Sequence, residues 1–569
     1  MNTSRIFTLG LVAANQATAL RARARRATAL SALCSLCTLL ALPAPAQAAL
    51  QISANGRHLV DEQGRPFLFN GDSSWSIFAQ PSWEDAKLYL QDRADRGFNF
   101  LGANLLEHRF SSNPPLNAAG DAPFTGTPFI TPNEAYFAHV DSVLSFAAER
   151  GIVFQLNVIY LGWVCGDQGW CNEVMAASLS DMREWGRFVG NRYGGYDNIM
   201  WSIGGDTDPS PVADKMREVV AGIREFDTDN LMTAHNVRGM QAITPWPDET
   251  WLQVNNVFSF RTALYQATQA AWENQPIRPF YLLEGFYENE HGSTSQQLRA
   301  QAYWAVLTGG FGVMTGNCPV WHFGYSSTWC GLTDWKSELD QQGSIQMAYY
   351  RDLFMSRRWH LLVPDVNGDL LTAGAGSWGA EDYATVAAAS DGSSLIAYIP
   401  TERSLEFDTS VLTGGQVRVW EYEPADGMAT LIGDFPKGLV AIAANSSGDR
   451  VIVIDDASIG FAAPGTPLAT AAPTAHAVGV RLLQNSPNPF NPSTQIRFEL
   501  THASRVRISI FDASGRQLRV LTDESMGAGP HQETWDGRDS SGKELASGVY
   551  YCRLQAGTES LGLKLVLLK

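Results

Sequence analysis

The fold is decided by two stretches, Asn198-Ile-Met-Trp-Ser-Ile-Gly-Gly-Asp206 and Pro279-Phe-Tyr-Leu-Leu-Glu284-Gly285. Each is a short apolar run that ends in a carboxylate beside glycine. Parallel strands that are buried on both faces are apolar in this way. In a closed barrel of parallel strands, functional side chains stand at the C-terminal ends of the strands. The two stretches therefore predict two carboxylates at the same mouth of one barrel.

Outward from these stretches, short apolar runs alternate with helical segments from Phe67 to Trp321. Eight strands with intervening helices over about 250 residues match a (β/α)8 barrel, a TIM barrel. The competing fold is a doubly wound open sheet, but the turn after the first strand, Gly71-Asp72-Ser73-Ser74-Trp75, lacks the glycine-rich phosphate pattern. The predicted strands are Phe67–Asp72, Phe98–Leu106, Ile152–Tyr160, Ile199–Asp206, Leu231–Asn236, Val254–Phe260, Phe280–Glu284 and Gly312–Asn317.

The helices between these strands are predicted from their end signals. Ser82 is the expected N-cap of the first helix and Gly97 its stop. The predicted helices are Trp83–Arg96, Glu134–Arg150, Ser180–Tyr193 and Gln296–Leu307, followed by one around Ile345–Arg357.

Beyond the barrel the pattern changes to short alternating runs that are separated by turn signals such as Asp391-Gly392, which indicates a β-sandwich. Asp365-Val-Asn-Gly-Asp369 lacks the full ligand set of a calcium loop, so a plain turn is expected there. A stretch rich in Ala, Pro and Thr is a linker by composition, and a second all-β module follows it. The predicted domains are 1–48 signal peptide, 49–360 catalytic barrel, 361–460 sandwich, 461–478 linker and 479–569 C-terminal module.

The N-terminus predicts export. Four arginines between Arg21 and Arg26 precede the apolar stretch Ala27–Leu42, and Ala46-Gln47-Ala48 offers a small-residue cleavage site. The mature chain is expected to begin near Ala49 and to contain no transmembrane segment. The net charge of −17 argues against nucleic acid or an anionic membrane surface as a partner.

Five cysteines remain after the predicted cleavage. Cys165 and Cys171 are close in sequence, as are Cys318 and Cys330, and in an exported protein each pair is a candidate local disulfide. The alternative is reduced, buried cysteine. Cys552 is left over. No His and Cys spacing fits a zinc site, so no metal and no organic cofactor are expected.

The opening strand Pro66-Phe67-Leu-Phe-Asn-Gly71-Asp72-Ser-Ser-Trp75, together with the order and spacing of several later blocks, forms a recognisable pattern. By this pattern, the sequence from about Leu59 to Asp455 resembles a known family of enzymes, the apiosidase-like glycoside hydrolases. The sandwich resembles the collagen-binding-like domain that accompanies this family. The other blocks are Tyr89-Leu-Gln-Asp-Arg93, Gly97-Phe-Asn99, Gly204-Gly-Asp206, Glu284 with Tyr287-Glu288, Ala302-Tyr303-Trp304, Gly316, Trp321, Trp335, Gly343 and Gln346-Met347.

The last module contains a series of characteristic segments. They are Gln484-Asn-Ser-Pro-Asn-Pro-Phe-Asn-Pro-Ser-Thr494, Ile510-Phe-Asp512, Gly515-Arg516, Trp535-Asp-Gly-Arg538, Ser547-Gly-Val-Tyr550 and Leu565-Val-Leu-Leu-Lys569. By these segments the module resembles the type IX secretion C-terminal sorting domain, which has an immunoglobulin-like fold. This resemblance implies export across the outer membrane by the type IX secretion machinery, followed by release or attachment at the cell surface.

The family resemblance implies that Asp206 is the general acid/base and Glu284 the nucleophile of a retaining glycosidase. The strand positions agree, since both residues end strands of the same predicted barrel and a pair of carboxylates suffices to cleave a glycosidic bond. Glu288 is the rival nucleophile, although it lies past the strand end. Asp206 is expected to have a raised pKa from burial and from the charge of Glu284.

Other side chains at predicted strand ends are candidates for substrate binding, against the alternative that they cap turns or lie satisfied in the core. Tyr287 is also a candidate to orient Glu284, and the loop Trp163–Cys171 a candidate wall of the pocket. The substrate-binding candidates are Asp72, Trp75, Asn157, Tyr160, His235, Asn236, Tyr287, Asn317 and Trp321, with His322 beside the last of them.

The sequence thus predicts a secreted or surface-exposed glycoside hydrolase that acts on a plant or algal polysaccharide side chain. The resemblance suggests apiose linked to a uronic acid, although related sequences serve other sugars. The alternatives are a surface protein that binds carbohydrate or matrix through a vestigial barrel, and a glycosidase of a different barrel family.

Overall fold

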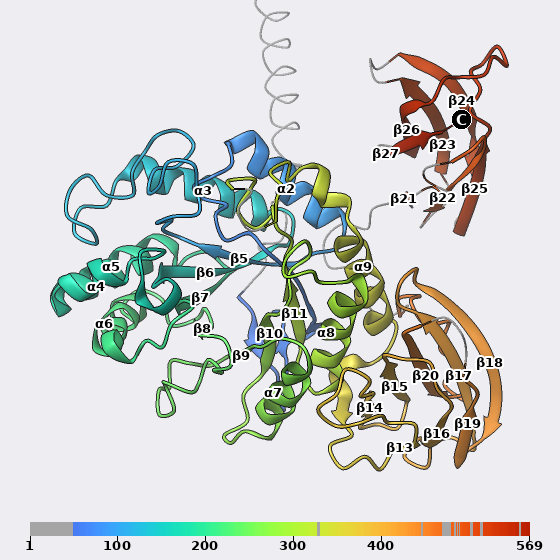
Figure 1. Ribbon diagram of the computed structural model, residues 1–569, viewed down its shortest axis with the longest axis horizontal. Helices are drawn as coiled ribbons and strands as arrows, with labels where there is room; N and C mark the ends of the chain where they lie inside the picture. The colour runs from blue at the N-terminus through green and yellow to red at the C-terminus, as the bar shows by residue number, and fades with distance from the viewer. Residues whose placement is uncertain are drawn as a thin grey trace, which may run out of the picture. The chain divides into compact units, whose positions relative to one another are not determined.

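The computed structural model describes residues 49–326, 330–444, 448–468, 480–482, 485, 488, 490–500, 504–512, 516–527, 529–556 and 559–568. The chain forms two compact units that divide between Leu468 and Ala469 (Figure 1). The predicted signal peptide and residues 469–478 of the predicted linker lie outside the described residues. Within the described part of the chain, no helix combines the length and the apolar character needed to span a membrane.

Eight parallel strands form the barrel at the centre of the first unit (Figure 1). Their order, β8-β7-β6-β5-β4-β11-β10-β9, is a cyclic permutation of the chain order, so the sheet curls almost into a closed ring and is not doubly wound. The predicted strands are therefore confirmed in number and order. They are β4 (Phe69–Ser73), β5 (Phe100–Asn104), β6 (Val153–Tyr160), β7 (Ile199–Gly204), β8 (Met232–His235), β9 (Asn255–Phe258), β10 (Phe280–Glu284) and β11 (Gly312–Thr315).

Four of the described helices around the barrel begin at a polar side chain that caps them. Ser82 accepts a hydrogen bond from the Asp85 N–H at the start of α2, Asn133 accepts one from the Ala135 N–H at α3, and Ser178 and Thr294 form capping boxes at α5 and α8. Three of the others, α4, α6 and α7, were not predicted from the sequence. The helices are α2 (Trp83–Asp95), α3 (Glu134–Ala148), α4 (Cys171–Ala176), α5 (Leu179–Tyr193), α6 (Ala213–Arg224), α7 (Thr262–Glu273), α8 (Ser295–Leu307) and α9 (Gln342–Met355).

A β-sandwich packs against the α8 side of the barrel (Figure 1). Its sheets have the orders β12-β14-β15-β20-β17-β18 and β13-β16-β19. Asp365 accepts hydrogen bonds from the N–H groups of Asp369 and Leu370, so this segment is the expected plain turn. The strands are β12 (Leu362–Pro364), β13 (Leu371–Ala373), β14 (Thr385–Ala389), β15 (Ser394–Ile399), β16 (Leu405–Asp408), β17 (Gln416–Glu423), β18 (Met428–Pro436), β19 (Leu439–Ile442) and β20 (Arg450–Asp456).

The barrel and the sandwich share one apolar core. The rings of Tyr303 on α8 and Tyr398 on β15 stack with centroids 5.1 Å apart. Arg357, which follows α9, pairs with the buried carboxylate of Asp455 at 2.7 Å. The sandwich is therefore an integral part of the first unit.

The second unit consists of two antiparallel sheets of the predicted immunoglobulin-like type, with the orders β21-β22-β25 and β24-β23-β26-β27. A short antiparallel sheet, β1-β2-β3, precedes the barrel in the first unit. The bounds of these strands are β1 (Gln51–Ile52), β2 (Leu59–Val60), β3 (Pro66–Phe67), β21 (Val480–Leu482), β22 (Thr494–Leu500), β23 (Ser504–Asp512), β24 (Gln517–Met526), β25 (Gly529–Trp535), β26 (Gly548–Ala556) and β27 (Glu559–Leu567).

Candidate active site

Asp206 and Glu284 lie at the same mouth of the barrel. Glu284 is the last residue of β10, the seventh barrel strand, and Asp206 follows β7, the fourth. The chain reaches Asp206 through Gly204 and Gly205, both with positive φ. A Cβ at Gly204 would lie 2.3 Å from the carbonyl oxygen of His235, so close packing against β8 requires glycine there.

His235, at the end of β8, lies between the two carboxylates. Its Nε2 is 3.3 Å from Oδ1 of Asp206 and 3.2 Å from Oε2 of Glu284. One oxygen of each carboxylate and one ring nitrogen of His235 all lie within 4.8 Å of one another. None of these three atoms has an aligned hydrogen-bond partner, although all three are buried. The ring of His235 therefore bridges the two acids.

Each carboxylate also accepts a hydrogen bond from a tyrosine. Tyr160, at the end of β6, donates to Oδ2 of Asp206 at 2.7 Å. Tyr287 donates to Oε1 of Glu284. The hydroxyl oxygen of Tyr287 accepts from Ser73 Oγ at 2.8 Å and from Trp75 Nε1 at 3.0 Å. Because Tyr287 has only one proton and accepts two bonds, that proton points to Glu284, which is thus fixed as an acceptor.

The environment moves the pKa values of all three groups. Burial raises the pKa of Glu284, with a further rise from the charge of Asp206, against the lowering effects of His235 and Tyr287. Burial would also raise the pKa of Asp206, but His235 and Tyr160 outweigh it and hold that pKa below its usual value. Burial would lower the pKa of His235, but the two carboxylates raise it to about 10. His235 is therefore an imidazolium at neutral pH.

The expectation of a raised pKa for Asp206 is wrong. It weighed burial and the charge of Glu284 but not the positive charge of His235, whose Nε2 lies 3.3 Å from Asp206. The sequence placed His235 on the neighbouring strand, but it did not reveal that the ring would bridge the two carboxylates.

The other substrate-binding candidates from the sequence divide into those that contact the carboxylate cluster or its loop and those that do not. Trp75 packs face to face on His235 with ring centroids 5.4 Å apart, and Trp321 donates from Nε1 to Glu290 at 2.8 Å. These two side chains contact the carboxylate cluster or its surrounding loop, as Tyr160, His235 and Tyr287 do. Of the other four candidates, Asp72 and Asn317 direct polar atoms to Arg93 and Glu288. Asn157 and Asn236 donate hydrogen bonds elsewhere in the protein, and the Oδ1 of each is buried without a hydrogen-bond partner.

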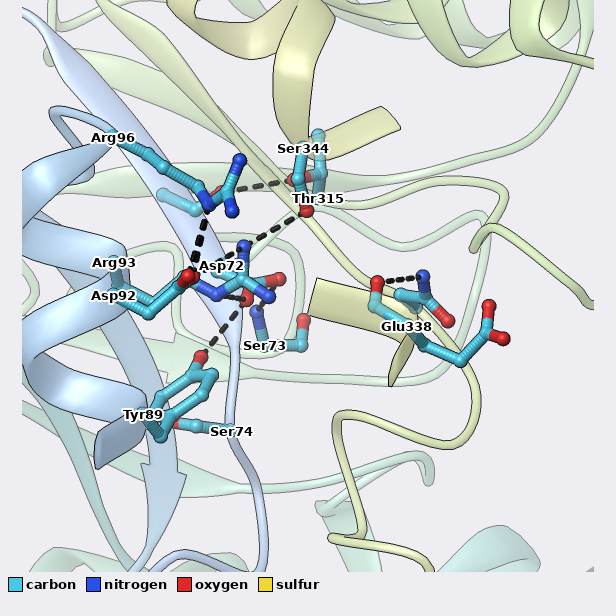
Figure 2. A network of polar contacts seen from close by, with 12 residues as sticks. Asp72, Ser73, Ser74, Tyr89, Asp92, Arg93, Arg96, Thr315, Glu338 and Ser344 are labelled. Carbon is cyan, nitrogen blue, oxygen red and sulfur yellow. Dashed lines mark hydrogen bonds and ion pairs between the residues drawn. The ribbon is translucent and has the colours of Figure 1, made fainter. Parts of the chain in front are cut away.

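Asp72 lies in a network of buried polar contacts (Figure 2). Its Oδ2 is 2.9 Å from Nε of Arg93 on α2 and accepts a hydrogen bond from the Tyr89 hydroxyl at 2.9 Å. Arg93 continues the network by donating to Ser344 Oγ at 2.8 Å. Asp72 therefore connects the end of β4 to the helices α2 and α9.

The three asparagines hold loops and strand ends together. Asn157 donates to Oδ1 of Asn104 at 2.9 Å and to the Gly204 carbonyl at 3.1 Å. Asn236 donates to two carbonyl oxygens of the loop that follows β8. Asn317 donates to Oε2 of Glu288 at 3.1 Å.

Glu288 and Glu290 follow Glu284 in the same segment but have different hydrogen-bond partners. Glu288, the rival nucleophile, accepts from the Gly343 N–H and from Asn317, and these bonds hold it away from the Asp206–Glu284 pair. Glu290 accepts from Trp321, and burial, with a smaller contribution from Glu284, raises its pKa to about 7. The sequence offered only one signal for Glu290, its place six residues after Glu284 in the same loop.

Both candidate disulfides, Cys165–Cys171 and Cys318–Cys330, form in the structure. The loop with the first disulfide borders the site, because the Val164 N–H donates to the carbonyl oxygen of Asp206 at 3.2 Å. Among the described cysteines outside these bonds, Cys552 is buried, and burial raises the pKa of its thiol to about 12.

Two groups of side chains in the described ranges have donor atoms close enough to hold a metal ion. One is Asp206, His235 and Glu284. The other is Cys318, His322 and Cys330, in which the disulfide occupies both sulfurs. The expectation that the protein uses no metal stays a prediction.

Comparison with known proteins agrees with this architecture. Residues 53–360, more than half of the chain, match a family described as "Apiosidase-like, catalytic domain". Residues 485–560 match the "FlgD Ig-like domain". No curated protein sequence matches the chain.

Two solved structures share the fold of the first unit. A glycoside hydrolase family 5 protein from Bacteroides vulgatus ATCC 8482 is 24% identical, with a TM-score of 0.65, over 73% of this chain and 95% of that one. A structure described as "Glycoside hydrolase" is 23% identical, with a TM-score of 0.65, over 73% of this chain and 98% of that one.

Proposed function

Because this chain belongs to the family of apiosidase-like catalytic domains and is a glycoside hydrolase, we propose that it cleaves its glycosidic bond with retention. The observation that carries this proposal is the close approach of the two carboxylates, one oxygen of each lying within 4.8 Å of the other. Retaining enzymes hold their carboxyl groups about 5–5.5 Å apart, and inverting enzymes about 6.5–9.5 Å apart to admit a water.

In the first step, the carboxylate of Glu284 attacks the anomeric carbon while the bond to the leaving oxygen breaks. Asp206 protonates that oxygen, and a covalent glycosyl ester of Glu284 forms. In the second step, Asp206 takes a proton from water, the water attacks the anomeric carbon and the ester bond breaks. The bond from Tyr287 supports Glu284 as the nucleophile, because it requires an acceptor at Oε1.

The stereochemical outcome tests the mechanism. Proton NMR of the first-formed sugar is expected to show the same anomer as the substrate, before mutarotation mixes the two. First formation of the opposite anomer would exclude a covalent role for Glu284.

His235 supplies the proton for the first step. Its Nε2 lies 3.3 Å from Asp206, and its pKa of about 10 keeps a proton in the cluster when Asp206 is ionised. The proton passes from Nε2 to Asp206 and on to the leaving oxygen, and the proton taken from water in the second step returns by the same route. Titrations of such a cluster belong to the group as a whole.

The pH profile of kcat/KM should therefore be broad. On the acidic side, kcat/KM is expected to rise with pH, and the midpoint of this rise should lie above pH 4.5. The reason is that the pKa of Glu284 is raised above 4.5 and that its protonated form cannot attack. On the alkaline side, kcat/KM is expected to fall only near pH 10, where His235 loses its proton. His235→Gln should lower kcat/KM by about 100-fold and move the alkaline limb toward neutral pH. An unchanged alkaline limb in this variant would contradict the proton route.

The substrate is proposed to be a side chain of a plant or algal polysaccharide, and the family suggests a sugar attached to a uronic acid. Arg238, which follows β8, supports an anionic substrate. Its guanidinium lies 4.9 Å from the ring centroid of Phe260, which stacks on Phe286 two residues beyond Glu284. A screen of pectic, hemicellulosic and algal glycans tests this class, and release of sugar only from neutral glycans would argue against it.

We also propose that the protein is secreted or displayed at the cell surface, with residues 1–48 as the signal peptide and 479–569 as the type IX sorting domain. The match of residues 485–560 to an immunoglobulin-like domain supports a separate module there. The close match of its sequence blocks to sorting domains supports a role of this module in export.

Deletion of residues 479–569 is expected to leave an active enzyme in the periplasm. The module forms its own compact unit, so its loss should spare the barrel and the sandwich. Activity in the medium, in intact cells and in the periplasmic fraction is the measurement, with the full-length chain as the control. Normal amounts of the truncated protein in the medium or at the surface would contradict the sorting role.

A further inference from the structure

An exposed tryptophan lies on the loop that joins β13 to β14 of the sandwich. Trp378 has half of its surface (50%) exposed to solvent. Large exposed indole rings bury apolar surface when they bind a partner, and their flat faces suit sugar rings. Neither the family match nor the proposed mechanism gives this residue a role.

The ring of Trp378 is held in place by its neighbours. It packs edge-on against Tyr265 on α7, with centroids 5.1 Å apart, and against Tyr383, with centroids 5.0 Å apart. The Tyr265 hydroxyl accepts from the Gly379 N–H at 2.7 Å and donates to the Ala380 carbonyl at 3.0 Å. The exposed face is therefore presented by a fixed loop, which reduces the entropy lost when a ligand binds.

This loop packs against the end of α7 that is nearer the catalytic mouth. The helix α7 begins at Thr262, four residues after the C-terminal end of β9, and the C-terminal ends of the barrel strands form the mouth. Arg261, just before α7, pairs with Glu381 of the loop at 3.6 Å. The same guanidinium lies 5.6 Å from the ring centroid of Phe286, two residues beyond Glu284. A line of contacts thus joins Phe286, two residues beyond Glu284, to the loop that carries Trp378.

We propose that Trp378 is a sugar-stacking platform that binds the polysaccharide substrate outside the cleavage site. The inference rests on the proposed function, because the ligand is the same carbohydrate chain that the barrel cleaves. The sandwich would then add a second binding surface to the enzyme and favour long substrates over short ones. Continuity with the mouth favours this ligand over a matrix protein.

The experiment separates binding from cleavage. In the Glu284→Gln background, affinity gel electrophoresis against pectic, hemicellulosic and algal glycans measures the Kd for each polymer. Trp378→Ala is expected to raise the Kd for the bound polymer by about threefold to tenfold. Trp378→Tyr should retain most of the affinity, because it keeps an aromatic face.

Leu439→Ala is the matched control, since Leu439 on β19 is 66% exposed and belongs to the same sandwich. With active enzyme, Trp378→Ala should raise KM for the polymer and leave kcat/KM for a short oligosaccharide unchanged. An unchanged Kd and KM for the polymer would overturn the proposal. Equal losses of kcat/KM on the polymer and on the short oligosaccharide would also overturn it. If the proposed catalytic function is wrong, the wild type releases no sugar from any glycan. The comparison of Kd values in the Glu284→Gln background still shows whether Trp378 binds the polymer.

Discussion

Glu284→Gln is expected to lower kcat/KM by about four to six orders of magnitude, with the fold unchanged. Glutamine has nearly the same shape and still accepts the hydrogen bond from Tyr287. It carries no negative charge, however, and cannot form the glycosyl ester. Rates of sugar release from the polysaccharide substrate, together with circular dichroism of the variant, provide the measurement.

Asp206→Asn should behave differently because it removes the acid and not the nucleophile. We expect a loss of about 10²–10⁴-fold on natural substrates, and a much smaller loss in the first step with an aryl glycoside, whose leaving group needs no proton. Added azide should rescue Asp206→Ala with formation of the glycosyl azide of retained configuration. The product from Glu284→Ala should have the inverted configuration.

Glu288→Gln is the matched control for Glu284. It is a buried glutamate in the same segment, but it accepts from Gly343 and Asn317 and not from Tyr287. We expect turnover of the wild-type order in the Glu288 variant. Wild-type rates in the Glu284 variant, or a complete loss only in the Glu288 variant, would reverse the assignment.

Asp72→Asn is expected to destabilise the protein by about 3–5 kcal/mol, because it removes one partner of a buried ion pair. Arg93 is fully buried, and the side chain of Asp72 is only 5% exposed. The substitution removes the nearest carboxylate of Arg93 and leaves Asp92, whose Oδ1 lies 3.6 Å from Nη1 of Arg93. The free energy of unfolding, measured by denaturant titration, should show this loss, whereas KM of the folded variant should stay unchanged.

Glu84→Gln provides the comparison. Glu84 pairs with Lys87 on α2 at 2.8 Å, but its side chain is 76% exposed, so about 1 kcal/mol or less is expected. A raised KM for Asp72→Asn with unchanged stability would return Asp72 to the group of substrate-binding residues. Equal losses of stability in the two variants would contradict the importance of burial.

Much of the barrel could be predicted from the sequence because its signals are local. Each strand is a short apolar run buried on both sides, and the helix ends are marked by residues such as Ser82 and Gly97. The unpredicted helices have weaker signals. For example, α7 begins after Arg261, which has positive φ and makes no side-chain capping bond.

The site was predictable only in part. Asp206 and Glu284 could be placed at one mouth because strand order fixes where strand ends meet. The same reasoning placed Asp72 and Asn317 at that mouth, but the structure directs their polar atoms to Arg93 and Glu288. A strand-end position does not reveal whether a side chain faces the mouth or the surrounding helices.

The order of the elements and the two strands that carry the carboxylates follow from local signals in the chain, since apolar periodicity and turn residues act over a few positions. The state of those carboxylates depends instead on the folded arrangement. His235 comes from a third strand and lies between them, and its charge reverses the expected pKa shift of Asp206. Electrostatic interactions depend on distances of a few ångströms between residues far apart in the chain, and only folding sets those distances.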